Sequence, residues 1–261
     1  MKKNRRTLTK TLIIIFSVII LLLLWQFVSM ILDSQILMPG VNDVLLRFFE
    51  LFASDNFIYD VLSTIIRAFE SFLIIVILAT ILGTLAGKYK VLGWFITPIL
   101  TVLKTTPVMS VILLAFIWFE TGTVPVFSAF LMGFPIMYMM MEGAVEQLEL
   151  EMDQMCYLYG FSTVQKLKYY IIPTLAKSFS LGARQTLSMV WKVVVAAEVL
   201  TIPKFGVGAK MQFAQIQLET AEVFSWTLIA ILLSAIGDLI FNLIESSIKK
   251  VSRYLKEKNA L

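Results

Sequence analysis

Long runs of apolar residues limit what this chain can fold into more than any other feature of its sequence. Between Thr11 and Leu32 the apolar run is broken only by Ser17, Gln26 and Ser29. A helix that crosses a lipid bilayer needs about 20 mostly apolar residues, and five further segments have similar length and character. The sequence therefore predicts six membrane-spanning helices, at residues 11–32, 65–86, 97–119, 124–141, 179–200 and 224–248.

The composition agrees with a membrane protein and excludes two other classes. Only 15% of the residues are charged and 59% are hydrophobic, whereas soluble domains contain about 25% charged residues. Disordered chains contain far fewer apolar residues than this one. We therefore expect a single all-α, polytopic membrane domain that covers residues 1–261 and has about six transmembrane helices.

Positive charge gathers at both ends of the chain. The first ten residues contain five lysine and arginine residues, and residues 249–258 contain five more. Basic residues are retained on the cytoplasmic side of a membrane, and six spans return the chain to its starting side. We therefore expect cytoplasmic N and C termini. The formal net charge of +4 is explained by this anchoring, so no nucleic-acid partner is expected.

Several kinds of active site are excluded by residues that the chain lacks. It has no histidine and one cysteine, Cys156, which excludes a Ser-His-Asp triad and a zinc site of cysteine or histidine. The segment Gly83 to Tyr89 looks like a phosphate-binding loop, but only three residues separate its glycines and Tyr89 replaces the required serine or threonine. We therefore expect no metal, no cofactor and no ATP site in this chain, and we expect Gly83 and Gly87 to pack against another helix.

The longest polar segment, residues 142–178, separates the fourth and fifth predicted spans. It carries too many charges to cross a membrane, and the six-span topology places it in the cytoplasm. Two helix-like stretches, residues 142–158 and 164–170, are separated by Gly160 and followed by Pro173, which is expected to end the second helix. The pattern predicts a two-helix projection from the membrane.

Gly160 and Pro173, thirteen residues apart, resemble the "EAA" loop of ABC importer permeases. That family has Glu-Ala-Ala, three residues, Gly, nine residues, Ile, one residue, Leu and Pro. The glycine and the proline match. The triplet departs from the pattern because Gln154 stands at the position of its glutamate, and Ile172 directly precedes the proline.

Further motifs extend the resemblance over nearly the whole chain. The nitrate/sulfonate/taurine-type subfamily is similar in Gly160-x-Ser162-x-x-Gln165, in Trp191 and in Val195-Ala196-Ala197-Glu198 followed by Gly206-x-Gly208. Lys104-Thr105-Thr106-Pro107 and the segment from Leu62 to Arg67 are similar too. The ordered set is more specific than the loop alone.

The resemblance implies a type I ABC importer permease-like fold in a bacterial cytoplasmic membrane, crossed several times. Such a permease pairs with a second copy or a sister permease. It docks a cytoplasmic ATPase that carries ATP and Mg, and it receives solute from an extracytoplasmic binding protein. Small solutes such as a sulfonate, taurine or nitrate then cross by alternating access. The residues implied in coupling to the ATPase are Gln154, Gly160, Phe161, Ser162, Gln165, Ile172 and Pro173.

Charged residues inside predicted spans are the candidates for a translocation path, because charge is costly in a bilayer. Arg184, Ser188 and Lys192 are spaced by four and lie on one helix face. They could line a path that attracts an anion. Alternatively, Arg184 extends toward the membrane surface, and Lys192 pairs with an acid such as Glu198 or Asp238 or faces a water-filled gap. The full set of path candidates is Arg184, Ser188, Lys192, Glu198 and Lys104.

Three alternatives stay open at this point. Glu198 is either a gate contact or a structural partner. The chain could be a stand-alone secondary transporter or channel, a class in which broken helices and midplane charges are common. A membrane-embedded enzyme ranks last, because no cluster of acids accompanies a nucleophile and histidine is absent.

Overall fold

The computed structural model describes the backbone of residues 2–148 and 150–258, and the side chains of residues 9, 11–148, 152 and 154–247. Every regular element within these residues is helical. In chain order the elements are α1 (Lys2–Leu32), α2 (Val41–Leu51), α3 (Phe57–Lys88), α4 (Lys90–Thr105), α5 (Val108–Trp118), α6 (Val124–Glu146), α7 (Leu150–Leu158), α8 (Thr163–Lys166), the π-helical turn η1 (Leu167–Ile171), α9 (Ile172–Thr201), α10 (Val207–Ile216) and α11 (Thr220–Lys258).

Four helices in the described part of the chain are long and apolar enough to cross a membrane: α1, α3, α6 and α11. The pair α4 and α5 passes the same test when the two helices are taken together. These helices confirm an all-α, multi-pass protein. The fifth predicted span, residues 179–200, lies within α9, whose 30 residues include Arg184, Lys192 and Glu198. Six spans and cytoplasmic termini stay predictions.

The sequence predicts one span at residues 97–119, but this range is not one continuous helix. It is divided between α4 and α5, which meet at an angle of 102°. The break falls at Thr106 and Pro107. Proline has no N–H to donate and forces the preceding residue toward extended conformations, and Thr106 has φ −72° and ψ 128°. The proline therefore turns the chain instead of being absorbed into a helix.

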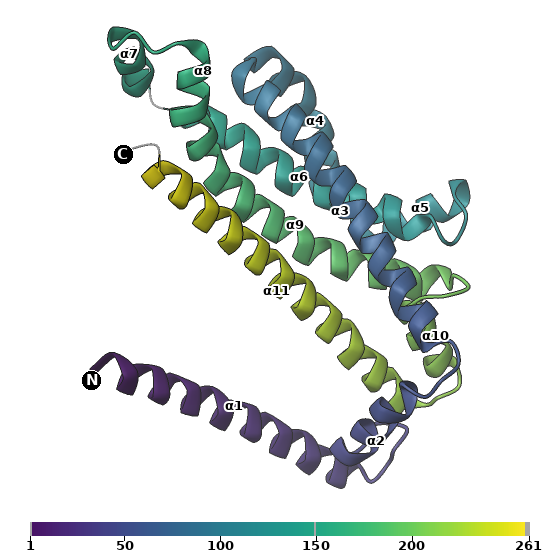
Figure 1. Cartoon of the computed structure of the whole chain (residues 1–261). Helices are drawn as coiled ribbons and strands as arrows, with labels where there is room; N and C mark the ends of the chain where they lie inside the picture. The colour runs from purple at the N-terminus through teal and green to yellow at the C-terminus, as the bar shows by residue number, and fades with distance from the viewer. Residues whose placement is uncertain (1, 149, 259–261) are drawn as a thin grey trace.

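The core of the molecule is formed by α3, α6 and α9, which pack side by side (Figure 1). Buried alanines on α3, including Ala68 and Ala79, allow close approach to Tyr138 on α6 and Val190 on α9. At Gly83 a Cβ atom would stand 2.6 Å from the carbonyl oxygen of Tyr138. The small residues of α3 are therefore needed for close helix packing.

Helix α1 stands apart from this core (Figure 1), and none of its apolar span is buried. It is attached through its C-terminal third. Trp25 Nε1 donates to the carbonyl of Pro39 at 3.0 Å, and the N–H of Val41 donates to Gln26 at 3.0 Å. The Trp25 ring also lies 5.1 Å from that of Phe224, between centroids. One end of α1 is thus fixed to the loop before α2 and to α11.

The described backbone of residues 150–171 forms the predicted projection, but Pro173 does not end its second helix. The chain continues from α8 through η1 into α9, and Pro173 lies in the first turn of α9. Proline is tolerated in a first turn, where its missing N–H would have no partner. The N–H of Ile172 bonds the carbonyl of Leu167, which gives the wider π turn.

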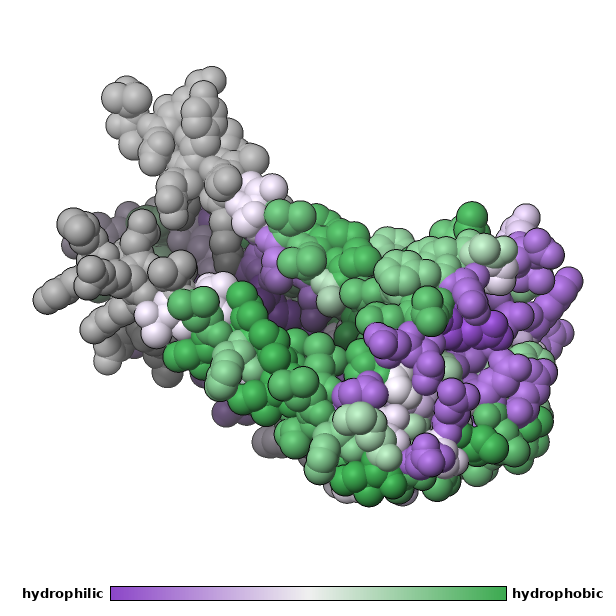
Figure 2. All heavy atoms as spheres, turned by 90° about the horizontal axis from the view of Figure 1, so that it is seen from below, coloured by the Kyte–Doolittle hydropathy of each residue, from purple (hydrophilic) through white to green (hydrophobic). Residues whose placement is uncertain are grey.

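We call the two sides of the molecule the α7 end (residues 150–171) and the α10 end (residues 202–219). Helix α1 begins and α11 ends on the side of the α7 end, while α2 lies at the α10 end (Figure 1). Hydrophobic residues cover the helices between the ends, and hydrophilic residues gather on the side of α2 and α10 (Figure 2). This distribution matches a molecule whose middle lies in a bilayer.

Candidate functional site

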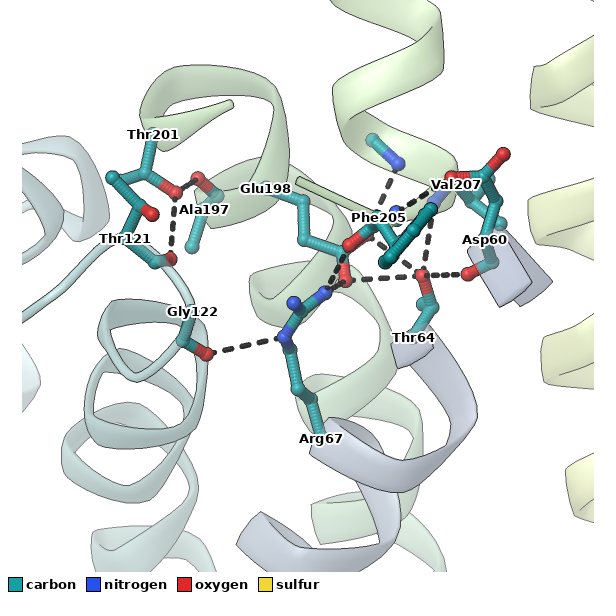
Figure 3. Close-up of polar contacts among 12 residues, drawn as sticks. Asp60, Thr64, Arg67, Thr121, Gly122, Ala197, Glu198, Thr201, Phe205 and Val207 are labelled. Carbon is teal, nitrogen blue, oxygen red and sulfur yellow. Dashed lines mark hydrogen bonds and ion pairs between the residues drawn. The ribbon is translucent and has the colours of Figure 1, made fainter. Parts of the chain in front are cut away.

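A buried polar cluster at the α10 end is centred on the carboxylate of Glu198, whose residue exposure is 0% (Figure 3). Arg67 Nη1 lies 2.6 Å from its Oε1, and the Thr64 hydroxyl lies 2.8 Å from its Oε2. The backbone N–H of Gly208 donates to the same Oε2 at 3.0 Å. Glu198 therefore links α9 to both α3 and α10.

The N-terminus of α10 is held by side chains from other helices. The N–H of Gly206 donates to Asp60 Oδ1 at 3.1 Å, and that of Val207 donates to the Thr64 hydroxyl at 2.9 Å. With Gly208 bound to Glu198, three consecutive N–H groups at this helix start have partners. Helix N-termini leave such groups unpaired and favour negative charge. The carboxylates therefore fix the position of α10.

Arg67 extends the cluster to two loops. Its Nη1 donates to the carbonyl of Phe205 at 2.8 Å, and its Nε donates to that of Gly122 at 3.1 Å (Figure 3). A Cβ atom at Gly206 would stand 2.8 Å from Glu198 Cδ, so no larger residue fits beside the carboxylate. The geometry favours the structural interpretation of Glu198, and a role in the path stays a prediction.

Sequence reasoning missed that Thr64 and Arg67 are partners of Glu198, and that Asp60 holds the N–H of Gly206 beside them. In the sequence, the segment Leu62 to Arg67 and the motif Gly206-x-Gly208 stand out only through their resemblance to a family. The signal available was that a span beginning near residue 65 carries an arginine that needs a buried acid. Nothing local in the sequence indicates which acid, because 131 positions separate Arg67 and Glu198.

The face formed by Arg184, Ser188 and Lys192 is directed partly at α11. Arg184 Nη2 lies 2.8 Å from Glu245 Oε2, and Ser188 is half-buried. Lys192 lines a pocket of about 590 Å³ between α9 and α11. Among the side chains that the structure describes, no ion pair joins Lys192 to Glu198 or to Asp238. Of the two, only Asp238 lines the same pocket.

Lys104 lies elsewhere, in the last turn of α4. Its Nζ is 3.4 Å from Met139 Sδ, and it lines a separate pocket of about 250 Å³ with Met132 and Met189. The five path candidates are therefore distributed among the Glu198 cluster, the α9–α11 face and the α4–α6 pocket. The structure does not bring these five side chains together within one copy, and their place in a path stays a prediction.

The implied coupling residues lie at or near the α7 end. Gly160 has φ +67°, a left-handed conformation that ends α7 and reverses the chain. The N–H of Ser162 donates to Gln165 Oε1 at 2.8 Å and the N–H of Gln165 donates to Ser162 Oγ at 3.3 Å, a reciprocal cap that starts α8. The others occupy α7, the turn and the first turn of α9: Gln154, Phe161, Ile172 and Pro173.

The tip of this projection is rich in uncovered aromatic and apolar side chains. Tyr157, Leu158 and Tyr159 are 86%, 80% and 77% exposed, and Val164 is 71% exposed. Contiguous exposed apolar residues on a protein mark surfaces that bind another molecule. We call Tyr157, Leu158, Tyr159, Phe161 and Val164 the aromatic tip.

A second, exposed charge cluster lies at the α10 end. Arg47 of α2 forms ion pairs with Glu50, Glu219 and Glu222. The hydrogen bond to Glu222 and the charges of the neighbouring carboxylates hold the pKa of Arg47 above its usual value, against the opposing effect of partial burial. Among the described residues, no group of three or more aspartate, glutamate or cysteine side chains is arranged to hold a metal ion.

Comparison with known proteins agrees with the resemblance found in the sequence. Residues 75–250 match the family of the binding-protein-dependent transport system inner membrane component. The putative aliphatic sulfonates transport permease protein SsuC of Bacillus subtilis is 25% identical over 234 residues, which are 88% of this chain and 84% of that protein.

Two other relatives show how broad the similarity is. The glycine betaine transport system permease protein OpuAB of Bacillus subtilis is 25% identical over 160 residues, 61% of this chain and 56% of that protein. The putative ABC transporter permease protein MJ0413 of Methanocaldococcus jannaschii is 23% identical over 197 residues, 73% of each chain. Because the family match covers more than half of its residues, the chain belongs to the inner-membrane components of binding-protein-dependent transport systems.

Proposed function

We propose that this chain is the permease subunit of an ATP-driven importer, and that its α7 end docks a separate ATPase on the cytoplasmic side. The aromatic tip is the observation that carries the proposal. Tyr157 and Tyr159 are largely exposed directly before the turn at Gly160. Tyrosine is among the residues that dominate binding energy at protein interfaces, so the tip suits a groove on a partner.

The connection from the tip to the membrane helices supports coupling by rigid-body motion. Helix α8, the turn η1 and α9 follow one another without a loop. At its other end α9 carries Glu198, which holds α3 and α10. A displacement of the tip would therefore move the Glu198 cluster as well, as alternating access requires.

The remaining components follow from the family and from the sequence. ATP and Mg belong to the partner ATPase, since this chain has no phosphate-binding loop. A solute-binding protein would dock at the α10 end, outside the cytoplasmic membrane of a bacterium, and a second permease copy or a sister permease would complete the pathway. The relatives named for aliphatic sulfonates and for glycine betaine support a small, charged solute.

The test is to purify the tagged chain in mild detergent from its native cells and to assay vanadate-sensitive ATPase activity that co-purifies. The double variant Tyr157→Ala/Tyr159→Ala removes two aromatic side chains of the tip. The ATPase activity that co-purifies with it is expected to be at least about tenfold lower than with the wild-type chain. Tyr59→Ala is the matched control. Tyr59 is an exposed tyrosine in the first turn of α3, at the α10 end of the molecule.

Two results would contradict the proposal. If the double variant retained as much ATPase as the wild-type chain, the aromatic tip would not be part of the docking surface. A folded wild-type chain that retains no ATPase would favour a stand-alone transporter or channel. The 102° break between α4 and α5 is the observation in favour of that second class, in which discontinuous helices are common.

A further inference from the structure

The pocket of about 590 Å³ between α9 and α11 is built almost entirely from these two helices, with Met211 of α10 at its edge. The two helices lie side by side (Figure 1). Most of the lining is apolar or small. Apart from Trp191, Lys192 and Asp238, its polar side chains are the hydroxyls of Thr227 and Ser234. A mostly apolar cavity with a few polar groups is the usual form of a small-molecule site.

The two charged residues of the pocket lie at the same level along the packed helices α9 and α11. A Cβ atom at Gly237 would stand 2.8 Å from Trp191 Nε1, so the indole packs directly against α11 at that point. Lys192 and Asp238 are the next residues on the two helices, and both line the pocket. They therefore present a cation and an anion from opposite walls.

Neither charge has an ion-pair partner among the side chains that the structure describes. Within the described side chains, Lys192 and Asp238 form no ion pair with each other, although both line one pocket. Asp238 Oδ1 and Trp191 Nε1 are buried and have no hydrogen-bond partner there. Leaving a buried polar atom without a partner is unfavourable. An occupant that donates to Asp238 would remove that cost.

We propose that this pocket binds a small zwitterion, with its anionic group at Lys192 and its cationic nitrogen at Asp238. The inference rests on the proposed function, since the occupant would be the solute on its way across the membrane. A solute with only an anionic group would meet the carboxylate of Asp238, and one with only a cationic group would meet the ammonium of Lys192. The indole of Trp191 gives the cationic nitrogen an aromatic neighbour.

The binding test uses the purified full-length chain in lipid nanodiscs, with radiolabelled taurine as the probe. Taurine is a zwitterion, and its two halves are represented by ethanesulfonate and ethylammonium. Taurine is expected to bind, and glycine betaine to compete more weakly, because its quaternary nitrogen has no N–H to donate to Asp238. Each half is expected to bind at least about tenfold more weakly, because it loses one charged contact and gains one repulsion.

Two variants separate the charges. Lys192→Met is expected to weaken taurine binding at least about tenfold. Asp238→Asn is expected to weaken taurine binding and to strengthen ethanesulfonate binding, because the repelling carboxylate is gone. A loss of structure would weaken both probes together and could not produce this opposite shift. Lys204→Met and Asp55→Asn remove the same charges from exposed positions outside the pocket, and they should leave binding unchanged.

Three outcomes would overturn the assignment: no binding of either zwitterion, equal affinity for taurine and ethanesulfonate, or unchanged affinities in both pocket variants. If Asp238→Asn does not fold, the comparison of taurine with its halves on the wild-type chain decides alone. No ATPase is present in this measurement. A chain that binds taurine but retains no ATPase contradicts the importer and keeps the site, and the reverse result contradicts only the site.

Discussion

At the α10 end of α9 the carboxylate of Glu198 is fully buried and bonded to Arg67, Thr64 and Gly208, whereas near its other end the side chains of Tyr157 and Tyr159 are almost wholly uncovered. The first region satisfies its polar groups within the chain. The second leaves large aromatic and apolar side chains uncovered by the residues that the structure describes. The difference indicates that substitutions at the α10 end should act on folding, and those at the α7 end on association.

The largest effect is expected from Glu198→Ala. The substitution leaves the largely buried Arg67 without its carboxylate, and removing one partner of a buried ion pair costs about 3–5 kcal/mol. Thermal unfolding of the purified chain in nanodiscs measures the loss. Glu219→Ala, at an exposed glutamate of the same end, is the control. An unchanged unfolding midpoint in Glu198→Ala would show that the cluster does not hold the fold together.

Gly208→Ala tests the close approach of α10 to α9. A Cβ atom at this position would overlap the carbonyl oxygen of Val195 and the Cβ of Glu198. Overpacking of this kind costs about 1–3 kcal/mol. The same change at Gly143 of α6, where nothing lies within 4 Å of the added atom, should not lower the unfolding midpoint, because alanine favours a helix more than glycine does. Equal midpoints for the two variants would remove the packing argument.

Gly160→Ala acts on the α7 end and is expected to be smaller and local. A left-handed conformation costs a residue with a Cβ atom about 1–2 kcal/mol, and Gly160 has φ +67°. Hydrogen exchange of residues 155–165 should accelerate, while the unfolding midpoint stays the same. Gly160→Asn is the control, because asparagine tolerates this conformation better. A fall in the midpoint would mean that the tip is part of the folding core.

Glu219→Gln is expected to have the smallest effect. Its ion pair with Arg47 is about half exposed to solvent, and pairs of this kind contribute about 0.5 kcal/mol or less. The unfolding midpoint should move little. The part of its salt dependence that comes from the pair of Arg47 and Glu219 should disappear. A loss as large as that of Glu198→Ala would erase the distinction between buried and exposed carboxylates on which the comparison depends.

The helices that could be predicted from the sequence are those whose own composition decides them. Residues 11–32 and the spans in α3, α6 and α11 are apolar over long stretches, and a bilayer selects helices from such stretches without help from packing. The break at Pro107 could not be predicted in this way. Pro135 also interrupts an apolar run, yet it is buried within the continuous helix α6. Packing against neighbours decides which proline bends the chain.

The candidate site was predictable only in part for a similar reason. The turn at Gly160 and the cap between Ser162 and Gln165 depend on residues close in sequence, and the motif located them. The partners of Glu198 come from a helix 131 positions earlier, and no local spacing reveals that pairing. The helix end expected at Pro173 was wrong because a proline that can end one helix is equally suited to the first turn of the next.

The π turn η1 has a consequence for how the chain tolerates changes of length. A π turn contains one residue more than the α turn it replaces, and here it lies directly between the projection and α9. A chain one residue shorter within 167–171 would close into an ordinary α-helical turn. Tyr159 would then keep its direction around the axis of α9. A chain one residue longer would rotate the projection, and Tyr159 with it, by about 100° around the axis of α9, which is the rotation per residue of an α-helix. Evolution can therefore trim this segment far more easily than it can extend it.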